Sequence, residues 1–108
     1  MIPKKKLKAI LSELRERFKA LYGDTLHRMI LYGSQARGDS EVGSDFDVLV
    51  VLEGFVRPYE EIVRTEGIVA EISLKYDVAV ACMFVSRDRY ETHRSPLLLN
   101  VHREGILL

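Results

Sequence analysis

Residues 31–52 read L-Y-G-S-Q-A-R-G-D-S-E-V-G-S-D-F-D-V-L-V-V-L and constrain the chain more than any other stretch. A Gly-Ser pair follows one apolar run, and an Asp-Phe-Asp triplet opens another. Alternate residues of a strand share a face, so Asp45 and Asp47 should project the same way, roughly 6.5–7 Å apart along the backbone. Two such carboxylates repel each other and favour a cation, and Mg²⁺ prefers carboxylate and phosphate oxygens. The stretch predicts a site where one or two Mg²⁺ ions hold a nucleoside triphosphate.

The Gly-Ser pair is the candidate phosphate loop. Gly33 permits an unusual backbone angle or the close approach of a ligand. Ser34 is expected to cap a short turn through Arg37, and its hydroxyl and the free N–H groups there would bind triphosphate oxygens. A plain strand-to-helix turn is the alternative, which the downstream acids disfavour. Arg37 has two open roles: it neutralises phosphate, or it braces the loop by pairing with Asp39 or another acid.

A Gly-Ser pair, then ten residues, then Asp-x-Asp resembles the signature of the DNA polymerase β-like nucleotidyltransferase superfamily. The short chain and the fuller G-S-Q-A-R-G form resemble its minimal nucleotidyltransferase branch. The resemblance implies an α+β fold, a small mixed sheet with helices mainly on one face. It also implies that Asp45 and Asp47 hold the metals while Gly33 and Ser34 hold the β- and γ-phosphates.

The resemblance further implies a reaction and a partner. The enzyme would transfer a nucleotidyl group, AMP from ATP, to a hydroxyl and release pyrophosphate. The acceptor implied is a tyrosine of a HEPN toxin, because this branch is often paired with HEPN proteins in toxin–antitoxin modules. Residues 1–108 are too few to carry a separate acceptor domain, so the acceptor pocket is expected to come from outside.

The third acid of the metal site is the open question. The resemblance implies an acid on the strand beside Asp-x-Asp, and the candidate strand, residues 76–85, contains only Asp77. In the family, the third acid often lies about five residues before the polar end of its strand. Counting back from Ser86, the polar end here, gives Ala81. Four residues of strand separate the two positions by roughly 13 Å, so both cannot occupy one site. Either Asp77 reaches the metals or the third acid is absent, with Glu66 and Glu71 as weaker substitutes.

Two other functions stay open. If the third acid is lost, the protein is a binding module that clamps its partner without catalysis. Nucleotidyl transfer to a small molecule, as in antibiotic nucleotidyltransferases, would need further domains and ranks last.

Composition limits the remaining classes. Sixteen basic and sixteen acidic residues cancel, which gives no support for a large nucleic-acid footprint and leaves self-association open. No apolar run approaches ~18 residues, so no membrane span is expected. The single cysteine, Cys82, fits a reducing cytoplasm and is interpreted as a core residue. The three histidines lack metal-ligand spacing and are expected to be structural or exposed.

Hydrophobic periodicity gives the element order. Helices are expected over 3–21 and from Pro58 to about 75, and strands over 26–32, 45–52 and 76–85, with a polar loop over 38–44. Ser86 and Ser95 are expected to cap two further helices, at 87–92 and from Pro96 to Gly105. The apolar tail 106–108 either adds an edge strand or docks on a partner.

Overall fold

The computed structural model describes residues 3–38 and 45–108. Its helices are α1 (Lys4–Tyr22), a 3-10 turn (Gly23–Thr25), α2 (Ser34–Arg37), α3 (Pro58–Tyr76), α4 (Arg87–Thr92) and α5 (Pro96–Glu104). Its strands are β1 (Leu26–Tyr32), β2 (Phe46–Leu52), β3 (Val80–Ser86) and β4 (Ile106–Leu107). Most of the loop predicted over 38–44, including Asp39, lies outside the described residues.

The strands form one mixed sheet in the order β3-β2-β1-β4. β1 pairs antiparallel with both β2 and β4, whereas β2 and β3 are parallel. A parallel pair needs a long crossover, and α3 provides it. β4 pairs Ile106 with Leu31 and Leu107 with Ile30, so the apolar tail forms an edge strand, one of the two predicted outcomes.

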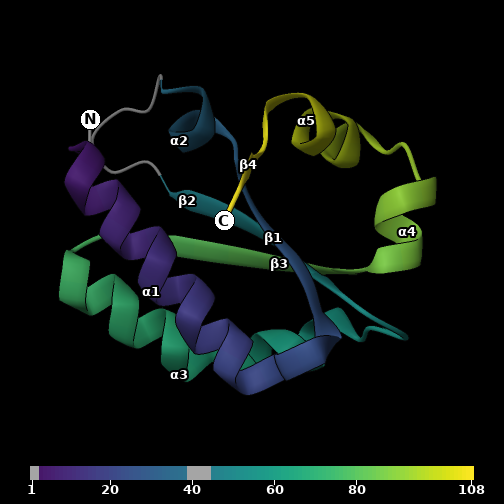
Figure 1. Cartoon of the computed structure of the whole chain (residues 1–108), viewed down its shortest axis with the longest axis horizontal. Helices are drawn as coiled ribbons and strands as arrows, with labels where there is room; N and C mark the ends of the chain where they lie inside the picture. Colours follow the sequence, from purple (N-terminus) through teal and green to yellow (C-terminus); the bar gives the residue numbers. More distant parts are fainter. Residues whose placement is uncertain (1–2, 39–44) are drawn as a thin grey trace.

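The two long helices cover one face of the sheet. Figure 1 shows α1 and α3 side by side on one side, with α4 and α5 on the other. The stripe of α1 buries Ile10, Leu14 and Phe18 against inward-facing residues of β2, which include Val48 and Val50. These side chains recur at helical spacing along α1 and at alternate positions along β2, which is why the sequence pattern located both elements.

The opposite face of the sheet is only partly covered. Leu49 and Val51 of β2 pack there with Tyr90 of α4 and with Leu98 and Val101 of α5. The predicted serine caps are present: Ser86 Oγ accepts from the Arg89 N–H at 3.2 Å, and Ser95 Oγ accepts from the Leu98 N–H at 3.3 Å. Helices therefore lie mainly on one face, and the other face keeps open space beside β2 and β3.

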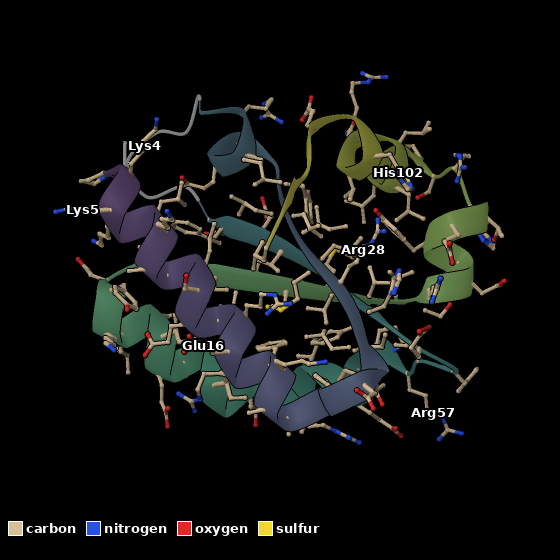
Figure 2. The ribbon with its side chains drawn as sticks, in the orientation of Figure 1. Lys4, Lys5, Glu16, Arg28, Arg57 and His102 are labelled. Atoms are coloured by element: carbon tan, nitrogen blue, oxygen red, sulfur yellow. The ribbon has the colours of Figure 1, made fainter. Side chains whose placement is uncertain are left out.

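The N-terminal lysines play no part in this core. Figure 2 shows Lys4 and Lys5 at the start of α1, pointing away from the sheet. Across the described ranges 3–38 and 45–108, no helix combines the length and apolar character needed to cross a bilayer.

Candidate active site

The two predicted aspartates lie at the start of the central strand β2. Asp45 comes one residue before the strand, and Asp47 is its second residue. Asp47 pairs with Tyr32 of β1 on one side and with Ala81 of β3 on the other. Asp45 is exposed and Asp47 is half-buried. The structure therefore places both acids at one end of the sheet, as the sequence predicted.

The electrostatics of Asp47 favour a bound cation. Burial raises the pKa of its carboxyl group above the usual aspartate range, and the nearby charge of Asp45 raises it further. A carboxylate in this state is stabilised by any cation that compensates both effects. Mg²⁺ fits this donor set because it commonly uses one or two carboxylates and completes its shell with phosphate oxygens and water.

Gly33 is fixed by its contact with Asp47. Its backbone has φ 77° and ψ −157°, a region that is essentially restricted to glycine. A Cβ atom added at Gly33 would lie 2.7 Å from Asp47 Oδ2. The sequence predicted an unusual backbone angle or a close approach here. The structure shows the unusual angle, and the group that approaches closely is the carboxylate of Asp47.

Ser34 does not have the capping role that the sequence predicted. Gly33 is the N-cap of α2, no side chain caps this helix, and Ser34 is its first residue. The N–H groups of Ala36 and Arg37 both donate to the Gly33 carbonyl oxygen at 3.1 Å. The cap shifts by one residue because only glycine can occupy the turn beside Asp47. The Ser34 N–H, in the first helical turn, has no acceptor within α2.

Arg37 braces the loop, one of its two predicted roles. Its Nη1 lies 3.0 Å from Oε2 of Glu104, which belongs to α5. The bridge joins α2 to the far end of the chain. Because α2 begins at the N-cap Gly33, this bridge helps to fix the turn that faces Asp47.

The two roles of Arg37 can be separated by substituting each partner of this ion pair. Glu104→Gln and Arg37→Gln both remove the exposed bridge, which should cost about 0.2–1 kcal/mol in the free energy of unfolding. Only Arg37→Gln also removes a cation from the loop. If Arg37 contacts phosphate, Arg37→Gln should weaken ATP binding clearly more than Glu104→Gln in a calorimetric titration. Equal losses in the two variants would restrict Arg37 to bracing.

The position beside Asp47 on β3 carries no acid. Ala81 is the direct neighbour of Asp47, as counting from Ser86 predicted. Strand β3 begins at Val80 rather than at Tyr76, because Asp77 takes a left-handed conformation (φ 52°) and ends α3. Asp77 is exposed in the turn between α3 and β3, four residues before Ala81.

The helix acids considered as substitutes lie elsewhere. Glu71 forms an ion pair with Arg17 of α1 at 2.9 Å, in the helical layer. Glu66 is exposed on α3. Among residues 3–38 and 45–108, no group of three or more His, Cys, Asp and Glu side chains is gathered as for a metal ion. Of the predicted site acids in the described ranges, Asp45 and Asp47 are the two that lie together.

Tyr32 is a site residue that sequence reasoning missed. It lies directly across from Asp47, and burial together with the Asp47 charge raises the pKa of its hydroxyl group. The tyrosine therefore stays neutral beside the acids. The available signal was its position immediately before Gly33, but the pairing of Tyr32 with Asp47 depends on the register between β1 and β2.

The other reactive side chains agree with the structural roles expected of them. Burial raises the pKa of the Cys82 thiol to about 12, which keeps it protonated and unreactive at neutral pH. His102 stacks on Tyr90, and its Nε2 lies 3.1 Å from the Tyr90 carbonyl oxygen.

Comparison with known proteins identifies a family and relatives that resemble this chain. A family model described as a nucleotidyltransferase domain matches residues 11–98. Two proteins of Methanocaldococcus jannaschii are similar in sequence, and both carry the name "putative protein adenylyltransferase". MJ0141 is 34% identical over 74 residues, which cover 67% of this chain and 72% of MJ0141. MJ1305 is 33% identical over 101 residues, which cover 90% of this chain and 67% of MJ1305.

Solved structures share the fold at low sequence identity. A toxin–antitoxin structure with AMP-PNP superimposes with a TM-score of 0.61 at 15% identity, over 87% of this chain and 68% of the other. The MntA-HpeT toxin–antitoxin mutant D39ED41E superimposes with a TM-score of 0.62 at 15% identity, over 93% of this chain and 69% of the other. These matches agree with a mixed sheet that has helices mainly on one face.

Proposed function

Because the chain belongs to the nucleotidyltransferase domain family, in its minimal nucleotidyltransferase branch, we propose that it catalyses Mg²⁺-dependent transfer of AMP from ATP to a hydroxyl of a partner protein. One observation carries the proposal: the partly buried carboxylate of Asp47, beside Asp45, lies against a glycine that no other residue could replace without strain. Carboxylates with a raised pKa cluster at catalytic and ligand-binding sites.

The proposed roles follow from the donor set. Asp45 and Asp47 would hold one or two Mg²⁺ ions, which when bound neutralise charge on the triphosphate. The Gly33–Ser34 turn and the guanidinium of Arg37 would contact the β- and γ-phosphates. Asp77 stays in the proposal as a third acid. It lies four positions before Ala81, the residue beside Asp47.

The chemical step is an in-line displacement at the α-phosphorus. The acceptor oxygen forms a new P–O bond, the bond to the bridging oxygen of the β-phosphate breaks, and pyrophosphate leaves with that electron pair. The hydroxyl proton passes to a carboxylate.

Names of related proteins support a protein acceptor. Relatives at 33% and 34% identity carry a protein adenylyltransferase name, and fold neighbours come from toxin–antitoxin structures. We therefore propose that the acceptor is a tyrosine of a HEPN-type toxin and that this chain acts as its antitoxin in the cytoplasm.

The first test is a thermal-shift titration of the wild type with ATP. With Mg²⁺ present, ATP at 100 times its dissociation constant should stabilise the folded protein by about 2.7 kcal/mol. With EDTA in place of Mg²⁺, most of this gain should disappear, because the triphosphate would face two uncompensated carboxylates. Equal stabilisation with and without Mg²⁺ would contradict a metal-dependent site.

A binding module without catalysis is the second candidate, and Ala81 favours it. The methyl group beside Asp47 provides no carboxylate on β3 to take the acceptor proton. A missing general base typically lowers rates by about 10²–10⁴-fold. In this case the protein would neutralise its partner by contact alone.

A further inference from the structure

The outer edge of β3 is available for another strand. The Phe46 N–H donates to the Ala79 carbonyl oxygen at 2.8 Å, and β2 and β3 are parallel. In this pattern odd-numbered residues of β3 direct their backbone groups toward β2, and even-numbered residues direct theirs outward. Within residues 3–38 and 45–108, no strand pairs with that outer edge. Cys82 and Phe84 therefore present backbone N–H and C=O groups to an incoming segment.

An apolar groove of about 740 Å³ lies along the same edge. Leu49 of β2 with Met83 and Val85 of β3 line it on the open face of the sheet, and Leu97 and Leu98 of α5 add to the lining. The Met83 side chain is 48% exposed although it lies within a strand. The charged residues among those lining the groove are Asp88 and Arg89, whose charges cancel. Such a groove is suited to uncharged apolar side chains.

Asp47 and the groove lie on the same face of the sheet. Successive pairs on this face are Asp47 with Ala81, Leu49 with Met83, and Val51 with Val85. Each pair is two residues further along, or about 7 Å. Asp47 and Ala81 therefore lie one residue pair beyond Leu49 and Met83, which line the groove.

We propose that the acceptor protein docks as an extended segment on the outer edge of β3. Its hydroxyl-bearing side chain lies beside Ala81 and Asp47, and apolar side chains two and four positions away fill the groove at Met83 and Val85. Side chains of a strand alternate between faces, so this spacing places all three on the face of the acids. The inference rests on the proposed transfer to a protein hydroxyl, and it specifies that this hydroxyl lies in an extended segment whose alternate side chains are apolar.

The test uses two labelled peptides, Tyr-Thr-Leu-Thr-Leu-Thr and its reverse, which allow for parallel and antiparallel pairing. Binding is measured by fluorescence anisotropy without nucleotide, so the result does not depend on catalysis. One orientation should bind, and replacing both leucines by asparagine should weaken binding at least about tenfold. Bound peptide should protect the amides of Cys82 and Phe84 from hydrogen exchange. Failure of both orientations to bind would overturn the proposal.

Matched variants test whether the peptide binds in the groove. Met83→Gln keeps side-chain length and charge and should weaken peptide binding at least about fivefold, whereas Met83→Leu should retain it. Leu21→Gln, at an α1 side chain of similar exposure (43%), should have no effect. Equal losses for Met83→Gln and Leu21→Gln would overturn the docking site.

The outcomes separate docking from catalysis. Peptide binding with no AMP transfer from Mg²⁺-ATP would support docking and count against the proposed function. AMP transfer to the peptide that Met83→Gln leaves unchanged would support the function and overturn the docking site.

Discussion

Replacing Asp45 and Asp47 together by asparagine is expected to abolish nucleotidyl transfer and to raise the stability of the nucleotide-free protein. The two carboxylates supply the proposed metal ligands, so transfer should fall at least about 10³-fold. The same substitution removes two neighbouring like charges, one of them partly buried. That relief should stabilise the fold by about 0.5 kcal/mol, or about 2–4 °C in Tm.

Three measurements on the double variant test this expectation: Tm without ligand, Tm with Mg²⁺-ATP, and AMP transfer. The matched control is Glu16→Gln/Glu66→Gln, which removes the same charge from exposed positions on α1 and α3; Figure 2 labels Glu16 on α1. The control should keep the stabilisation by Mg²⁺-ATP, whereas the double variant should lose it. A double variant that still gained stability from Mg²⁺-ATP would exclude these acids as the metal site.

The double variant also separates the enzyme from the binding module. An enzyme loses its effect on the partner when both aspartates become asparagine, because no group is transferred. A module that acts by contact keeps its effect, because asparagine preserves the shape of the site. Full neutralisation of a toxin partner by the double variant would therefore support the binding module.

Stability against pH gives an independent check on Asp47. Its pKa is raised in the fold, so the folded protein holds this proton more tightly than the unfolded chain. The associated stability is present at pH below the ordinary value of 3.8 and is lost as pH rises through the higher folded value. The stability difference between the wild type and the double variant should therefore be largest at neutral pH and shrink in acid.

Gly33→Ala is expected to lower both stability and nucleotide binding. The backbone at Gly33 is in a region that costs other residues about 1–3 kcal/mol. The new methyl group would also press on Asp47 Oδ2, 2.7 Å from the Cβ position, and displace the carboxylate. Urea unfolding should show the loss of stability, and the stabilisation by Mg²⁺-ATP should fall with it.

Gly23→Ala is the control for backbone strain alone. Gly23 has φ 57° and ψ −130°, close to the angles of Gly33, but an added Cβ would meet no atom within 4 Å. Gly23→Ala should cost stability and leave nucleotide binding unchanged. If both variants bound Mg²⁺-ATP like the wild type, the contact between Gly33 and Asp47 would have no functional role.

The sequence predicted the elements whose side chains repeat regularly. The helix expected over 3–21 is α1 (Lys4–Tyr22), because its apolar stripe faces the sheet, and Pro58 begins α3 as expected. The start predicted for β3, at Tyr76, was wrong because the local sequence of Tyr76, Asp77 and Val78 is typical of a strand. The left-handed turn at Asp77, which allows the Val78 N–H to donate to the Ser73 carbonyl oxygen, leaves no periodic signal.

The candidate site was predictable only in part. Spacing identified Gly33, Asp45 and Asp47 as one group, since strand alternation fixes how Asp45 and Asp47 project. The neighbours of Asp47 on β1 and β3 depend on strand order and register, which arise from tertiary packing. Tyr32 therefore went unnoticed. The Arg37–Glu104 bridge spans 67 residues of sequence, and no local pattern indicates it.

The pairing of β4 with β1 also determines when the site is completed during folding. Leu31 pairs with Ile106, so this contact closes a loop of about 75 residues, and the entropy of loop closure makes such contacts slow to form. The β1–β2 pair needs a much shorter loop, since Tyr32 pairs with Asp47. Glu104 lies two residues before Ile106, so its bridge to Arg37 also closes a long loop, of 67 residues. The two aspartates are therefore assembled early, and the loop opposite them gains its brace in the final step of folding.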